Sequence, residues 1–400
     1  MTKWKFAYIL LVIIVLTNCI VYGSNYDITK DIAIEKALKA SQELIIRNNL
    51  IQKLERDYND AVIESRSIKD LLYMDERLWH LTHKNDKTFE ENMEYQILKS
   101  LLSEPMTETD AFQLTLASEI NADNIRYAIN VNKAILSSTR NSIVFNIYQQ
   151  FISLDKINGN IENQRSLIIN LEKSFDTAEK KFKYGKISNN DLKLLSLQLN
   201  KEKVVLSRLL IQREIMVSTI QKYIGESNDK KYSAYKIEMP IINISARELS
   251  DYKEDAFSDR VDLANAIQYS ELKKRKFEIT KRNYYYETNI NHINALIELN
   301  DAQNKLDNLY IDVEQQVLNA YELLLNQINL IESNRQNYEI SELKYNEAQE
   351  RYRLGLFTEL QLSKANIEYI QSKTNYENAK KEGLLKKLSL DNICGLSLLN

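Results

Sequence analysis

Glycine and proline are scarce in this sequence, which holds seven glycines and two prolines among 400 residues. Average usage would give about 28 and 20 in a chain of this length. Both residue types form turns and interrupt helices, so their scarcity excludes a fold of many short elements. The sequence therefore predicts an all-α fold of few, long helices.

An excess of charge of either sign is also missing, because 53 basic and 56 acidic residues leave a formal net charge of −3. This balance argues against a nucleic-acid partner, which would need a basic face. Cysteine is nearly absent, with Cys19 and Cys394 alone. Beyond the N-terminal segment, no stretch approaches the ~20 apolar residues that a membrane helix requires.

Residue types that carry catalysis or bind metals are sparse. The chain has three histidines, and no segment has two glycines close enough to form a phosphate-binding loop. Glu76, His80 and His83 would share one face of a helix and could bring three ligands together. A pair of surface histidines beside Trp79 is the simpler interpretation. We therefore predict no enzyme activity and no catalytic, cofactor-binding or metal-binding residues.

The N-terminus has the pattern of a secretory signal peptide. Lys3 and Lys5 precede an apolar run over residues 6–16, and small or apolar residues precede Ser24 at the positions a signal peptidase reads. We predict a signal peptide over residues 1–23 and an exported protein. An uncleaved membrane anchor and lipoprotein processing at Cys19 are the alternatives.

An internal repeat organises the rest of the sequence. The separation between Gly185 and Gly355 equals the separation between Gly225 and Gly395. Apolar residues before and after Gly185 step by three, four or seven, which is the spacing of a coiled-coil seam. The same register returns around Gly355, where tyrosine occupies several seam positions, including 338, 345 and 352.

Each repeat predicts a long helical hairpin. A glycine that adopts positive φ can end a helix of about 40 residues. Ser188 or Thr358 can then cap the returning helix, and Asp191 or Glu359 places negative charge in its first turn. Nearby lysines at 180, 181 and 183 are interpreted as a solvated helix face. Such a hairpin needs a second hairpin to cover its other apolar face.

The beginnings of the two repeats also match, since Ala37 and Leu44 align with Ala256 and Leu263. This second offset is larger than that of the glycines, so the first repeat carries an insertion. We predict a first helical repeat over 24–225 with an extra helical segment at about 58–122, a linker over 226–252, and a second repeat over 253–400. The linker contains a short extended piece around Pro240.

These features together resemble the TolC-type outer-membrane factor family. The resemblance is carried by the turns at 184–188 and 354–358, by the heptad helices that follow, and by residues 256–263, where Val261 replaces a frequent proline. It covers about 28–57 and 123–400. The resemblance implies a homotrimer that forms a hollow α-helical duct for drug efflux or type I secretion. Its partners would be a periplasmic adaptor and an inner-membrane transporter, and its location the outer membrane and periplasm.

The resemblance also implies roles for residues at the two turns. The implied adaptor-docking positions are Tyr184, Gly185, Lys186, Leu354, Gly355 and Leu356. The implied tip-closure and entrance positions are Asp191, Tyr352, Gln361 and Lys364. Gln361 and Lys364 stand where the family often places aspartates, so cation selectivity is not expected here.

The sequence departs from the family in the segments that would form membrane strands. About 282–307 has room for at most one short strand and a turn, and 58–122 has a helical apolar pattern. We therefore predict two tandem, long antiparallel coiled-coil hairpins, like a TolC α-barrel protomer, with little or no β-barrel. Tyr284, Tyr285 and Tyr286 are interpreted either as part of an aromatic girdle at a membrane surface or as ordinary half-buried residues.

Two functions compete at this point. The first is a trimeric export duct, and the second is an extracytoplasmic coiled-coil scaffold that kept the hairpins but does not conduct. Membrane association is possible for either one.

Overall fold

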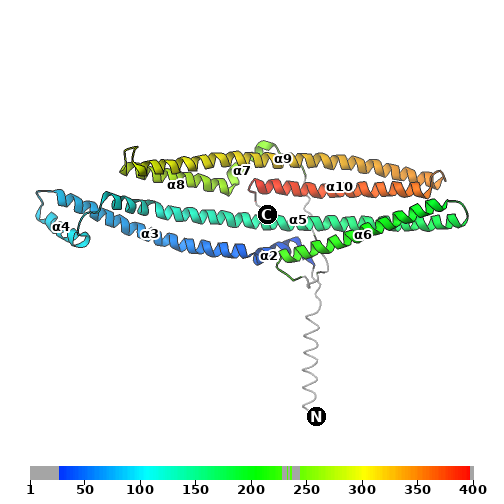
Figure 1. Cartoon of the computed structure of the whole chain (residues 1–400), viewed down its shortest axis with the longest axis horizontal. Coiled ribbons are helices and arrows are strands. Elements are labelled where there is room, and N and C mark those ends of the chain that lie inside the picture. The colour runs from blue at the N-terminus through cyan, green and yellow to red at the C-terminus, as the bar shows by residue number, and fades with distance from the viewer. Residues whose placement is uncertain (1–26, 228–231, 233–234, 237–243, 397–400) are drawn as a thin grey trace, which may run out of the picture. The chain divides into compact units, whose positions relative to one another are not determined.

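The computed structural model describes residues 27–227, 232, 235–236 and 244–396 (Figure 1). The predicted signal peptide, with Cys19 and the cleavage position before Ser24, lies outside these residues. So does Pro240 of the predicted extended piece. The described segments are almost entirely helical, which confirms the predicted all-α fold.

The elements follow one another in a simple order. They are β1 (Ile28–Thr29), α2 (Lys30–Ala40), α3 (Gln42–His83), α4 (Phe89–Leu102), α5 (Glu108–Lys183), α6 (Asn189–Tyr223), β2 (Tyr235–Lys236), α7 (Leu249–Asp259), α8 (Val261–Asn283), α9 (Ile290–Arg353) and α10 (Glu359–Ile393). Strands β1 and β2 pair in parallel, with Ile28 opposite Tyr235. The extra segment of the first repeat is helical, and α7 begins inside the predicted linker. The domain boundaries stay a prediction.

The internal repeat is visible in the helix boundaries. Helices α6 and α10 have 35 residues each, and they begin and end at positions that differ by the same offset as the paired glycines. The ends of α5 and α9 are related by this offset too, whereas α2 and α7 match at the larger offset of the repeat beginnings. Both sequence offsets therefore reappear as structural ones, and the prediction of two tandem helical hairpins is confirmed.

The repeated glycines end helices by adopting positive φ. Within the described residues, the glycines in this conformation are those at 185, 225, 355 and 395. Gly225 also needs to be small, because a Cβ there would lie 2.7 Å from the Cβ of Ala40. Gly395 packs in the equivalent place of the second repeat, where a Cβ would lie 3.1 Å from the backbone of Asp259. Each second glycine thus allows close packing as well as a helix stop.

The helices divide into two compact units, and α5 and α9 are each shared between them. Unit 1 holds α2, residues 143–183 of α5, α6, residues 324–353 of α9, and most of α10. One of its apolar clusters joins α5 to α6 through Leu167, Ile168, Leu171 and Leu199, and Ile367 of α10 packs against it. The predicted seam of the first hairpin is therefore a buried core.

The second hairpin of unit 1 has an aromatic seam. Tyr345 and Tyr369 stack with their ring centroids 5.3 Å apart, and Tyr338 stacks on Tyr376 at 6.0 Å. The four rings are half-buried between α9 and α10. Tyrosine therefore fills heptad positions at 338 and 345, as the sequence predicted. Its ring packs against the facing helix while its hydroxyl reaches solvent or a polar group.

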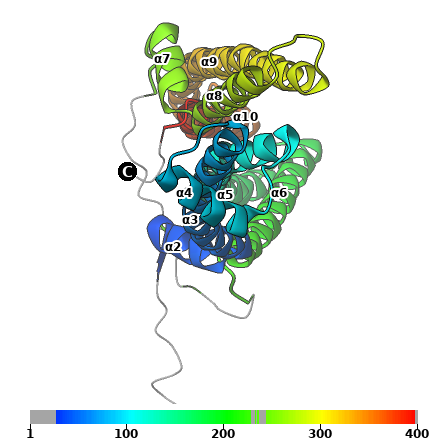
Figure 2. The same ribbon diagram turned by 90° about the vertical axis from the view of Figure 1, so that its left-hand side faces the viewer.

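Unit 2 holds α3, α4, residues 108–142 of α5, α7, α8 and residues 290–323 of α9. Viewed from the end where α4 lies, α4 packs against α3 and α8 lies beside α9 (Figure 2). Phe112 and Ile120 of α5 form a buried cluster with Leu272 and Ile279 of α8. Ion pairs between α8 and α9 join Lys273 and Lys276 to one carboxylate, that of Glu298.

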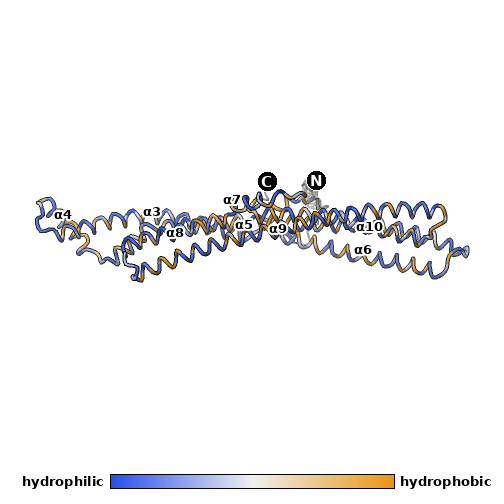
Figure 3. Tube along the Cα trace, turned by 90° about the horizontal axis from the view of Figure 1, so that it is seen from above, coloured by the Kyte–Doolittle hydropathy of each residue, from blue (hydrophilic) through white to orange (hydrophobic). Residues whose placement is uncertain are grey.

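Apolar and polar residues alternate along the helices in the pattern of amphipathic elements (Figure 3). Within the part of the chain that the structure describes, no helix has an apolar stretch long enough to cross a membrane.

Two glycine substitutions should have opposite effects on stability. Gly159 lies inside α5, where a Cβ would meet only the Nζ of Lys381 at 3.4 Å. Gly159→Ala should stabilise the protein by about 0.5–1 kcal/mol, because alanine favours the helix. Gly225→Ala should destabilise it by at least about 1–2 kcal/mol, because φ is +71° and Ala40 occupies the space. Urea unfolding of both variants measures the difference, and equal effects of one sign would contradict this account.

Candidate functional site

The two hairpin turns of unit 1 are the strongest candidates for a functional site. The first turn joins α5 to α6 and the second joins α9 to α10. Every residue to which the sequence analysis gave a docking, closure or entrance role lies in or near these turns. Both turns are built from the same local interactions, so their shape follows directly from the sequence.

Each turn begins with a glycine-dependent helix stop. In the first, the backbone N–H of Gly185 donates to the carbonyl of Phe182 at 2.8 Å, and that of Lys186 donates to Lys181 at 2.9 Å. This pair of bonds is the Schellman motif, which requires positive φ at the glycine. Gly355 and Leu356 repeat it, and φ is +70° at Gly185 and +76° at Gly355.

A hydroxyl cap then starts each returning helix. The Oγ of Ser188 accepts a hydrogen bond from the backbone N–H of Asp191 at 3.1 Å and donates to its carboxylate at 2.9 Å. Thr358 and Gln361 form a reciprocal capping box, in which the backbone N–H of Thr358 donates to Gln361 Oε1 at 2.7 Å. Asp191 and Gln361 thus stabilise helix starts, whatever further role they have.

The turns present large side chains to solvent. Tyr184 is 81% exposed, Leu354 63% and Leu356 70%. A Cβ added to Gly185 or Gly355 would meet nothing within 4 Å. The three large side chains therefore form an exposed apolar surface at the capped turns, and no other part of the described chain covers it.

A polar cluster connects the two hairpins just behind their turns. The Nζ of Lys181 on α5 donates to the hydroxyl of Tyr352 on α9 at 3.1 Å and lies 3.7 Å from the carboxylate of Glu359 on α10. The hydroxyl of Tyr352 donates to the same carboxylate. Glu359 is buried, being 8% exposed. Three helices thus share one charge-assisted network, which we call the tip cluster.

Proton binding within the tip cluster follows from its burial and its charges. Burial lowers the pKa of Lys181, but the hydrogen bond to Tyr352 and the charge of Glu359 outweigh it, so that the pKa lies above 10.5. Burial, followed by the bond to Glu359, raises the pKa of Tyr352 above 10.0. Both groups therefore hold their protons more tightly in the folded state than in the unfolded one.

The sequence analysis missed two members of this cluster. It interpreted Lys181 as part of a solvated face and Glu359 only as a first-turn acid, whereas the tertiary packing brings both to Tyr352. Lys181 and Tyr352 belong to different repeats, so no local pattern reveals their contact. Gln361 and Lys364 are exposed on α10, both near the start of that helix.

The histidines considered for metal binding do not form a cluster with Glu76. His80 Nε2 lies 4.0 Å from Glu76 Oε1, and His83 Nδ1 is hydrogen-bonded to the carbonyl of Trp79 at 2.8 Å. His83 also packs against the Trp79 ring. Among the residues described, no three potential ligands are placed to hold a metal ion.

Comparison with known proteins identifies the fold. No protein-family model matches this sequence, and no curated protein matches it. Solved structures do match it. The outer-membrane protein VceC of Vibrio cholerae has a TM-score of 0.62 at 12% identity, and the match covers 92% of this chain and 96% of VceC.

Two other structures extend the comparison. A membrane protein from Pseudomonas aeruginosa has a TM-score of 0.65 at 10% identity, covering 93% of this chain and 91% of the other. CusC, described as forming a transmembrane channel, has a TM-score of 0.64 at 11% identity, covering 93% of each chain. At these identities the likeness shows the fold alone. That fold is the one of TolC-type outer-membrane channels, as the resemblance implied.

Removing the Tyr352 hydroxyl should weaken the tip cluster. Tyr352→Phe leaves the buried Glu359 carboxylate short of one donor, which should cost about 1–2 kcal/mol. Urea unfolding of Tyr352→Phe, Glu359→Gln and the double variant should reveal coupling, since the two residues share a bond. Because both raised pKa values lie in the alkaline range, the stabilisation should be present below pH 10 and lost as the pH rises further.

Tyr184→Phe is the control, because Tyr184 is a tip tyrosine exposed to solvent. Its stability should equal that of the wild type. Additive effects of Tyr352→Phe and Glu359→Gln would show that the bond does not stabilise the folded chain.

Proposed function

We propose that the chain is one protomer of a trimeric α-helical export duct in the cell envelope, which works with a periplasmic adaptor and an inner-membrane transporter. The fold supports this proposal, since the structures that share it over nine-tenths of the chain are outer-membrane proteins and channels. The duct serves efflux or type I secretion and is not an enzyme. The chain is exported and resides in the outer membrane and periplasm.

The observation that carries the proposal is the exposed apolar surface of the two turns. Tyr184, Leu354 and Leu356 are more than half exposed, although each follows or flanks a rigidly capped helix end. Exposed large apolar residues at a preorganised site are typical of protein-binding surfaces. We assign the adaptor to this surface, with Gly185, Lys186 and Gly355 providing its backbone shape.

The tip cluster explains how a closed duct entrance can be held within one protomer. In the proposed duct, Tyr352 holds α9 against α10 and α5 through Glu359 and Lys181. Opening of the entrance would separate these helices and break the cluster. Asp191 lies in the first turn of α6, and Gln361 and Lys364 lie near the start of α10. We assign these three residues to the entrance, where a ring of three Lys364 side chains would not favour cations.

The proposal requires a defined oligomer. A hairpin with an incompletely covered apolar face needs neighbouring copies to close a tube. Sedimentation velocity of the purified chain at micromolar concentration should give three times the protomer mass. A monomer under these conditions would exclude the closed duct and would favour the non-channel scaffold.

Adaptor docking can be tested by position-specific photo-cross-linking in the host cell envelope. A photoreactive residue at position 356 should capture a protein with an α-helical hairpin, identified by mass spectrometry. Position 343 is a matched control, because Leu343 on α9 is 70% exposed, as is Leu356. Equal capture at the two positions, or no capture at 356, would refute the docking assignment.

A further inference from the structure

Helix α4 has two apolar faces, of which one packs against α3 and the other is exposed to solvent. Leu98 is buried against Leu78 and Leu81 of α3, with Tyr95 and Leu102 of α4 beside it. A second row, Phe89, Met93, Ile97 and Leu101, points to solvent with exposed fractions of 81%, 55%, 57% and 64%. The four residues recur at every fourth position and so follow one side of the helix. We call this row the α4 stripe.

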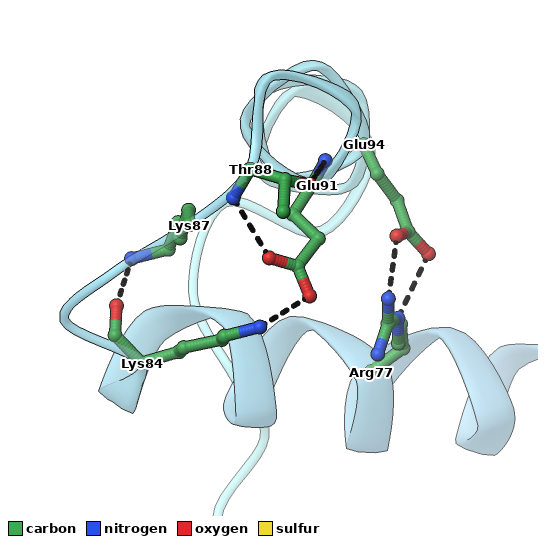
Figure 4. A network of polar contacts seen from close by, with 6 residues as sticks. All are labelled: Arg77, Lys84, Lys87, Thr88, Glu91 and Glu94. Carbon is green, nitrogen blue, oxygen red and sulfur yellow. Dashed lines mark hydrogen bonds and ion pairs between the residues drawn. The ribbon is translucent and has the colours of Figure 1, made fainter.

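The orientation of α4 is fixed by a polar network at its first turns (Figure 4). Thr88 and Glu91 form a capping box. The carboxylate of Glu91 also binds Lys84 at 2.5 Å, and Arg77 of α3 makes two hydrogen bonds to Glu94 at 2.8 and 2.9 Å. These contacts and the packed apolar face hold α4 on α3. Because these contacts fix the orientation of α4, the α4 stripe faces solvent in the folded protein.

The charged side chains of α4 and of the loop before it lie on different sides of the helix. Glu91 and Glu94 are paired with Lys84 and Arg77. Lys87 and Lys99 lie over the Tyr95 ring at 5.1 and 5.6 Å. Tyr95 packs against the cluster of Leu78, Leu81 and Leu98, so these two lysines lie toward the side of α4 that faces α3. The exposed Glu90, in contrast, lies next to Phe89 and Met93 of the stripe. Charge therefore does not select the partner of the stripe, which its area and the length of α4 decide.

A second element of unit 2 also exposes aromatic side chains. Tyr284 packs on Phe112 with the ring centroids 4.7 Å apart, whereas Tyr285 and Tyr286 are 77% and 78% exposed in the turn between α8 and α9. This turn and α4 lie toward the same end of unit 2 (Figure 1). Tyrosines whose rings meet a polar–apolar boundary are characteristic of residues at a membrane surface.

The size of the stripe argues against a second copy as its partner. Four such side chains expose on the order of 500 Å² together, against about 800 Å² that each partner contributes to a stable interface. The length of α4 argues against a spanning role. Its 14 residues extend about 21 Å, less than the ~30 Å hydrocarbon core. A short amphipathic helix with an exposed apolar side is suited to lie in the plane of the interface.

We infer that the α4 stripe inserts into the surface of a phospholipid bilayer, with Tyr285 and Tyr286 as a second, shallower contact. The helix lies in the plane of the membrane surface, with its stripe among the acyl chains and its polar residues toward the headgroups. This contact is a property of unit 2 and does not depend on whether the chain forms an export duct.

Co-sedimentation of the full chain with vesicles tests the inference. Vesicles of phosphatidylcholine, alone and mixed with phosphatidylglycerol, should bind the wild type. Met93→Glu/Ile97→Glu should lower the bound fraction at least about tenfold, because charge in the stripe opposes insertion. Ile46→Glu/Ile63→Glu is the matched control on α3, where the replaced residues are 65% and 63% exposed, and it should bind like the wild type.

A second variant separates a loss of membrane binding from a loss of folding. Phe89→Ser removes the most exposed residue of the stripe without adding charge, and its binding should fall by a smaller factor at unchanged circular dichroism. Wild-type chain that stays in the supernatant, or stripe variants that bind as the wild type does, would overturn the inference. The inference would also be overturned if the wild-type chain does not bind vesicles and the stripe variants lose the oligomeric state of the wild type. That result would assign the stripe to a contact between copies of the chain.

Discussion

The architecture depends on the reversal of long helices at glycines with positive φ. A helix that ends in a Schellman motif leaves its last carbonyls bonded and turns the chain within a few residues. The sequence uses four of its seven glycines in this way, and two of them, Gly225 and Gly395, also admit a neighbouring backbone or side chain at close range. The antiparallel pairing of α5 with α6 and of α9 with α10 follows from these stops, as does the exposure of the turns between them.

The two hairpins of unit 1 bury their seams by different means. Leucine and isoleucine cover the seam of the first, where directionless apolar contacts are sufficient. Stacked tyrosines form the seam of the second, and each ring adds a hydroxyl that needs a polar partner or water. The tip cluster meets this need for Tyr352. The second seam therefore combines ring packing with hydrogen bonds, whereas the first relies on apolar packing.

Exposed apolar surface occurs in two settings that differ in geometry. At the turns of unit 1, three large residues project from rigid caps, a geometry suited to a protein partner. On α4, four residues form a linear stripe along a short helix, a geometry suited to a lipid surface. The first surface is the docking site of the proposed export duct, and the second is the proposed membrane contact of the additional helices in the first repeat.

The sequence by itself determined the helical class, the two repeat offsets, the four helix stops and the caps at Ser188 and Thr358. These features are local or periodic, so residue type and spacing are sufficient to predict them. Only the tertiary structure decided that Lys181 and Glu359 meet at Tyr352, that Tyr284 turns inward while Tyr285 and Tyr286 turn outward, and that α4 leaves one apolar face unused. Each of these depends on contacts between different helices, whose relative rotation no single helix pattern specifies.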